Sequence, residues 1–166
     1  MTNLKEAAQI VINDCMAVQE DETVLVITDE TLRKVGKSFF AEAKKVAKEA
    51  ILVEISPRAN HGEEPPESIA NLMQQVDVIL MPTSKSLSHT KARKEANKAG
   101  ARAATLPTIT EEIMNRTLNA DYKDIEERSI KLAKKLTVGK EARVIAPNGT
   151  NIKMELGTRE GHPDTG

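Results

Sequence analysis

Hydroxyl side chains and one histidine gather in a short stretch of the 166-residue chain, between an apolar run at 76–81 and a basic segment at 89–99. Hydroxyls beside the free N–H groups of a helix start can bind an anion or a charged peptide end. The same residue types also cap helices. We favour the simpler interpretation, in which Ser88 caps a helix and His89 packs or faces solvent. The candidate ligand-binding residues are Thr83, Ser84, Ser86, Ser88, His89 and Thr90.

The polar residues of the chain form no convincing catalytic group or metal site. A serine nucleophile paired with His89 would need a third group to orient the base, and adjacent side chains diverge. Two acidic and histidine clusters occur, but they are far apart in the sequence, whereas a metal site needs three or four converging ligands. We therefore predict no catalytic residue and no metal ligand here, and we interpret these clusters as solvated loop residues: His61, Glu63 and Glu64, and His162 with Asp164.

Two nucleotide-binding motifs, the phosphate-binding loop and the dinucleotide fingerprint, lack required residues in this sequence. Gly36-Lys37-Ser38 resembles the end of a phosphate-binding loop, yet position 31, where the first glycine belongs, is a threonine. The tripeptide also falls inside an amphipathic helical pattern. After the first predicted strand the chain reads Thr28-Asp29-Glu30-Thr31, whose carboxylates would repel a pyrophosphate. Both motifs are rejected.

Hydrophobic periodicity predicts alternating helices and strands. Strands such as 23–28 are unbroken apolar runs, which indicates a parallel sheet covered on both faces. The predicted fold class is α/β, a doubly wound, mostly parallel Rossmann-like sheet flanked by helices. Helices are predicted at about 3–18, 30–48, 67–75, 89–99 and 122–136, and strands at 23–28, 51–55, 76–81 and 101–106. A capping box, Thr108-Ile109-Thr110-Glu111, is expected to open one further helix, which ends at about Leu118.

The end of the chain carries a different pattern. Asn148-Gly149 lies between two strand-like segments, 142–146 and 152–156, and predicts a C-terminal β-hairpin. The expected divisions are a Rossmann-like domain over 1–138, the appended hairpin over 139–157 and a linker over 158–166. The expected buried side of the preceding helix consists of Ile125, Ser129, Leu132, Ala133 and Leu136.

Composition excludes several classes of protein. A net charge of −1 and 2% aromatic residues argue against nucleic-acid binding. The single cysteine, Cys15, excludes an internal disulfide and suits a reducing compartment. No apolar run approaches the ~20 residues that span a bilayer, and the start of the chain lacks the form of a signal peptide. We therefore expect a cytoplasmic protein with no membrane or nucleic-acid partner.

Four segments together resemble the N-terminal half of the thermophilic metalloprotease family, the leucyl aminopeptidases of the aminopeptidase T and S type. They are ETVLVITDE, SLSHTKARKEANKAGARAATLPTITEE, the hairpin with Asn148-Gly149-Thr150, and the closing GTREGHPDTG. The resemblance covers essentially the whole chain. Its most specific parts are Ser88–Arg93 and Ala99–Arg102.

The resemblance implies a non-catalytic N-terminal domain of a metal-dependent leucyl aminopeptidase. In that family the metal ions, here expected to be zinc or cobalt, are held by the C-terminal half, so no metal or catalytic residue is carried over onto this chain. The expected partners are the chain's own missing C-terminal catalytic domain, reached through the linker at 158–166, and a second copy in a homodimer at full length. The fragment alone is expected to be inactive.

Two other readings stay open. The chain is alternatively a stand-alone α/β module that binds a small anionic ligand near His89. It is also conceivable as an interaction domain whose hairpin, with Ile152 and Met154 on one arm, docks a partner.

Overall fold

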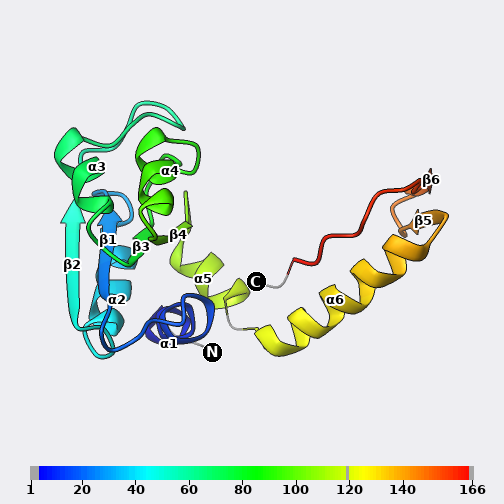
Figure 1. Ribbon diagram of the computed structural model, residues 1–166, viewed down its shortest axis with the longest axis horizontal. Helices are drawn as coiled ribbons and strands as arrows, with labels where there is room; N and C mark the ends of the chain where they lie inside the picture. The colour runs from blue at the N-terminus through cyan, green and yellow to red at the C-terminus, as the bar shows by residue number, and fades with distance from the viewer. Residues whose placement is uncertain (1–3, 119, 165–166) are drawn as a thin grey trace. The chain divides into compact units, whose positions relative to one another are not determined.

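The computed structural model describes residues 4–118 and 120–164, and the chain forms two compact units, residues 1–119 and 120–166. The first unit contains four strands: β1 (Thr23–Thr28), β2 (Glu49–Glu54), β3 (Val78–Met81) and β4 (Arg102–Thr105). They pair in parallel in the order β2-β1-β3-β4 (Figure 1). This arrangement confirms the predicted α/β fold class.

A helix follows each of these strands near its expected position. These helices are α2 (Arg33–Ala43), α3 (Glu67–Met73), α4 (Lys91–Lys98) and α5 (Glu111–Thr117). None of the helices in the described part of the chain combines the length and the apolar character needed to cross a lipid bilayer. The predicted capping box opening at Thr108 is wrong: Thr110 caps α5 by accepting a hydrogen bond from the N–H of Ile113, and Thr108 has a positive φ of 58°.

The first helix departs from its prediction as one α-helix over 3–18, of which residue 3 lies outside the described part. α1 (Leu4–Ile10) continues as a π-helix, η1 (Val11–Cys15). The N–H of Met16 reaches the carbonyl of Val11, five residues back, over 2.8 Å. Apolar periodicity does not distinguish this wider turn from an α-turn. Ala17, with φ of 45°, then directs the chain towards β1.

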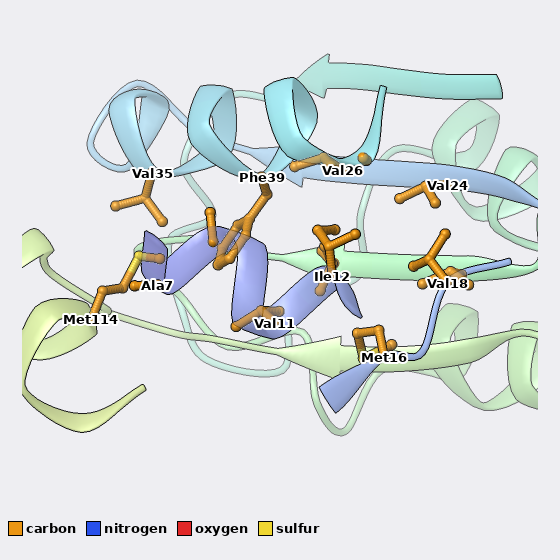
Figure 2. Close-up of a cluster of buried hydrophobic side chains, with 14 of the residues drawn as sticks. Ala7, Val11, Ile12, Met16, Val18, Val24, Val26, Val35, Phe39 and Met114 are labelled. Carbon is orange, nitrogen blue, oxygen red and sulfur yellow. The ribbon is translucent and has the colours of Figure 1, made fainter. Parts of the chain in front are cut away.

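Two aliphatic clusters cover the two faces of the sheet. Val24 and Val26 of β1 contribute to the cluster that α1, η1, α2 and α5 complete, with Phe39 fully buried in it (Figure 2). Leu25 and Ile27 contribute to the opposite cluster, which α3 and α4 complete. Because successive strand residues point to opposite faces, the unbroken apolar run in β1 supplies both clusters at once.

Gly36 lies inside α2, as the rejection of a phosphate-binding loop required. A Cβ at this position would lie 2.7 Å from the Cβ of Thr28 at the end of β1. The glycine therefore allows close packing of α2 on the strand. The apolar side chains of α2 and of the residues next to it pack on the sheet: Leu32, Val35, Phe39 and Ala43 are buried, and Val46 and Ala47 are partly buried against the same cluster.

The second unit consists of α6 (Tyr122–Val138) and the antiparallel pair β5 (Glu141–Ile145) and β6 (Asn151–Glu155). The predicted hairpin is therefore confirmed, with Gly149 at φ of 95° in its turn. The predicted domain limits at 138 and 157 stay a prediction, and the structure groups α6 with the hairpin. Residues 165 and 166 of the predicted linker lie outside the described residues.

The predicted buried side of α6 is only partly present. Ala133 is buried, and the following tail packs on it: a Cβ on Gly161 would lie 2.4 Å from the Ala133 carbonyl oxygen. The N–H of Gly161 also donates to the hydroxyl of Thr137 over 2.9 Å. Leu132, however, is 57% exposed. The sequence pattern identifies an apolar stripe but not what covers it, so that part of the prediction is wrong for this chain.

A bidentate ion pair joins the start of β4 to the segment before β1. The guanidinium of Arg102 donates to both carboxylate oxygens of Glu22 over 2.6 and 2.8 Å, and to the carbonyl of Met16 over 3.0 Å. The hydrogen bonds from Arg102 lower the pKa of Glu22 below its usual value of 4.5. This pair therefore fixes the end of η1 against the sheet.

We expect Glu22→Gln to lower the free energy of unfolding by about 0.5–1 kcal/mol at neutral pH, as for a well-aligned, partly exposed pair. A carboxyl with a lowered folded pKa stabilises above its unfolded pKa, and this contribution is lost as the pH falls through the folded value. The deficit should therefore shrink as the pH falls below about 4.5. Urea unfolding followed by circular dichroism measures it. Glu20→Gln, at an exposed neighbouring position, is the control, and a deficit independent of pH would contradict the assignment.

Candidate ligand-binding edge

The sheet order creates a distinctive position between β1 and β3. These strands are neighbours, although the chain passes through β2 on the far side of β1 before it returns. Open α/β sheets bind ligands at such a switch point, outside the carboxyl ends of the strands. Thr28 ends β1 and Asp29 follows it at this edge, and the β3–α4 loop, residues 82–90, follows β3. All six predicted site residues belong to this loop.

The loop residues differ in exposure. Thr83 and Thr90 are buried, with 2% and 0% of their surface exposed. Ser84, Ser86 and Ser88 are half-buried, and His89 is exposed. The structure thus gathers the predicted residues at one edge, with the histidine on the outside.

Most of the hydroxyls bond within the protein. Thr83 donates to the carbonyl of Lys85 over 2.7 Å. The Ser86 hydroxyl donates to that of Ser88 over 2.8 Å, and the Ser88 hydroxyl lies 2.7 Å from that of Thr105 at the end of β4. The serines are therefore joined to each other and to the sheet. This chain of hydroxyls contains no imidazole, in keeping with the rejection of a serine–histidine pair.

The cap of α4 is Thr90 rather than Ser88, which corrects the sequence interpretation. The Thr90 hydroxyl accepts from the N–H of Arg93 over 3.2 Å and donates to the carbonyl of Leu87 over 2.7 Å. Ser88 contributes its carbonyl instead, which accepts from Nε of Arg93 over 2.8 Å. The hydroxyls around the helix start thus shape the corner between loop and helix.

Asp29 occupies the switch point itself. Its side chain is 1% exposed. One carboxylate oxygen accepts from the N–H groups of Thr31 and Leu32 over 3.1 and 3.2 Å, and the other accepts from the N–H of Ser84 over 2.6 Å. A buried carboxylate needs such donors to offset its lost hydration. The protein's own anion therefore takes the donors that an anionic ligand would use at this crevice.

A second carboxylate occupies the start of α4. Glu64, from the loop that precedes α3, accepts from the N–H of Lys91 over 2.5 Å and from the N–H of Ala92 over 3.0 Å. These are the first N–H groups of the helix, where its dipole favours negative charge. With the third taken by Thr90, the helix start is saturated by groups of the chain.

The same loop touches the β3–α4 loop at Ser86. The N–H of Ser86 donates to Nδ1 of His61 over 3.0 Å, and the Ser86 carbonyl accepts from the N–H of Gly62 over 2.8 Å. His61 thus belongs to the candidate edge, although it lies in a different loop. Its bonds are structural contacts between two loops.

A metal ion has no suitable ligand set in residues 4–118 and 120–164, where no group of three or more His, Cys, Asp or Glu side chains converges. The carboxylates of the cluster His61, Glu63 and Glu64 bind backbone N–H groups. Glu63 accepts from the N–H groups of Ala59 and Asn60 over 2.7 and 3.2 Å, while Glu64 holds the start of α4. These donor atoms serve the backbone of the loop, so they do not fit a metal site.

Sequence reasoning missed the two carboxylates that complete this edge. Asp29 was considered as a charge that would repel a pyrophosphate, but its bond to Ser84 spans 55 residues of sequence. Glu64 gave no local signal, because its helix starts 27 residues later. Whether the six predicted residues bind a ligand stays a prediction; among the six, His89 is the exposed one.

No protein-family model matches the sequence, and a search of curated proteins found no match. Solved structures do resemble the fold. 2,5-Dihydroxypyridine dioxygenase from Pseudomonas putida KT2440 matches 93% of this chain with a TM-score of 0.66 and 17% identity. AmpT from Thermus thermophilus matches 81% with a TM-score of 0.51 and 13% identity. At these identities the likeness shows the α/β fold alone.

The chain spans about half the length of these proteins, 47% of the dioxygenase chain and 48% of the AmpT chain.

We expect Asp29→Asn to lower the free energy of unfolding by about 2–3 kcal/mol, because the amide loses the charge and turns an NH₂ group towards backbone donors. Chemical denaturation measures this loss. Asp77→Asn is the matched control, since Asp77 is exposed and accepts one N–H, from Thr23. Equal losses in the two variants would contradict the role assigned to Asp29.

Glu64→Gln should loosen the contact between its loop and α4, because a neutral amide caps a helix start less well than a carboxylate. We expect a loss of about 0.5–1 kcal/mol. Hydrogen exchange of residues 57–66 and of the Lys91 and Ala92 amides should accelerate. The same change at exposed Glu67 is the control. Unchanged exchange at Lys91 would count against the cap.

Proposed function

We propose that this chain is the N-terminal, non-catalytic part of a larger metal-dependent leucyl aminopeptidase, which removes N-terminal residues from peptides. The observation that carries the proposal is the agreement of two likenesses. The sequence segments resemble the aminopeptidase T and S type, and the fold matches AmpT over 81% of this chain and 48% of that one. The chemistry is assigned to the part of the enzyme that this chain does not contain.

The hydrogen bonds of the most family-like residues support a structural role. Ser88 and Arg93, within Ser88–Arg93, bond to each other, and Thr90 caps α4. Arg102, at the end of the second specific stretch, bonds to Glu22 and Met16. Each of these side chains has a partner inside the first unit. Such residues hold the loops at the two ends of the strands and leave the reaction to groups elsewhere.

The metal requirement of such an enzyme also points outside this chain. The carboxylates of Glu63 and Glu64 hold backbone N–H groups, and Nδ1 of His61 accepts from Ser86. Binding a divalent ion with these atoms would break the two loop contacts and the helix cap. We therefore place the zinc or cobalt ions in the second half of the enzyme, where they would polarise the scissile carbonyl and supply hydroxide.

A second candidate follows from the higher TM-score of 0.66 with the dioxygenase, over 93% of this chain. The same half would then serve a larger enzyme that acts on a hydroxylated aromatic ring. This candidate shares the assignment of a non-catalytic α/β half and differs in the reaction.

Two purified proteins test the proposal: this chain, and the product of the natural reading frame including any codons beyond Gly166. With zinc or cobalt added, we expect only the longer product to cleave leucine p-nitroanilide, and a chelator to stop it. Chelator-sensitive cleavage by the 166-residue chain would overturn the proposal. So would a longer product that consumes oxygen with 2,5-dihydroxypyridine and leaves the anilide intact, which supports the second candidate.

A further inference from the structure

The second unit exposes apolar side chains that the first does not. Every exposed large hydrophobic side chain in the described residues lies between 132 and 154, and Ala133 is the single buried hydrophobic residue described there. A helix and a two-stranded hairpin bury too little to be stable alone. The exposed residues are Leu132, Val138, Val144, Ile145, Ile152 and Met154, with exposed fractions of 57%, 83%, 48%, 66%, 52% and 42%.

The hairpin has one apolar and one charged face. Ala142 pairs with Met154, and Val144 with Ile152. Directly opposed residues point to the same side, so these four form one apolar face. The alternate pairs carry the charges, as in Arg143 opposite Lys153. The apolar face is therefore continuous across both strands.

α6 carries a hollow with a regular spacing. Its lining residues are Ile125, Arg128, Ser129 and Leu132, which are positions i, i+3, i+4 and i+7 of the helix. Four residues at this spacing form the hole that receives one side chain from a facing helix. Because the side chain of Ser129 is small, the hollow remains open between Ile125 and Leu132. The hollow thus fits an aliphatic side chain on a helix packed along α6.

We propose that these two surfaces, the hairpin face and the α6 hollow, are the docking surface for the second half of the enzyme. That half would lay a helix along α6 and apolar strand residues on the hairpin face. This inference rests on the proposed function. Its support is the length comparison: about half of each longer structure lies outside the match, since this chain spans 47% and 48% of them.

The choice of occupant follows from the surfaces available. The exposed large hydrophobic side chains of the described residues all belong to the second unit. A second copy would present the same two surfaces. The second half is the occupant that brings new apolar residues and is tethered by the tail after β6, which raises its effective concentration.

Hydrogen exchange on the chain of 166 residues and on the longer natural product tests the inference. We expect amides of residues 141–156 to exchange at least about tenfold more slowly in the longer product, because docking covers the hairpin and makes its local opening rarer. Ile152→Lys should lower the Tm of the longer product by several degrees and leave that of the shorter chain unchanged. Ile145→Lys is the matched control, because Ile145 lies on the charged face.

The outcomes separate this inference from the proposed function. Equal exchange in the two proteins, in a longer product that cleaves the anilide, overturns the docking surface alone. Protection of the hairpin in a longer product without peptidase activity overturns the proposed function alone. A reading frame that stops after Gly166 overturns both. A dimer of the 166-residue chain that forms with rising concentration in analytical ultracentrifugation, and that Ile152→Lys dissociates, makes a second copy the occupant.

Discussion

The first unit depends on one buried carboxylate at the switch point of its sheet, between β1 and β3. Asp29 follows β1, yet it holds the backbone of the loop that follows β3 as well as the entry to α2. β1 and β3 are adjacent without being consecutive. A group that satisfies N–H donors from both sides of this junction sets the position of the loops that leave the sheet. Its burial is tolerated because each oxygen has a donor.

The candidate edge is completed by the chain itself. In α/β proteins that bind phosphates, backbone donors and a helix start at this position face an incoming anion. Here Asp29 and Glu64 occupy the corresponding donors, and the loop hydroxyls bond among themselves. The arrangement gives the unit a rigid edge and reduces its capacity for anions. Such rigidity suits the non-catalytic role that we propose for this chain.

Sequence patterns predicted what depends on near neighbours in the chain. The strands, the helices and the Asn148-Gly149 turn follow from periodicity and local backbone preference. The identity of the carboxylates at the edge did not follow, because Asp29 and Ser84 are brought together by a sheet order that the residues do not specify locally. The wide turn at η1 has the same apolar pattern as an α-helix. The exposed Leu132 has a similar cause: apolar periodicity identifies a stripe on a helix but does not show which residues cover that stripe.

The position of β1 also affects the order in which the unit forms during synthesis. β1 is the first of the sheet's four strands to be synthesised, and it is flanked on both sides, by β2 and β3. Its second edge stays unpaired until residues 78–80 have been made, and Asp29 gains the donor of Ser84 later still. Parallel pairs separated by long connections form slowly, and open strand edges promote association of unfinished chains. A translational pause before residue 84 would therefore prolong the interval in which the nascent chain is most exposed to aggregation.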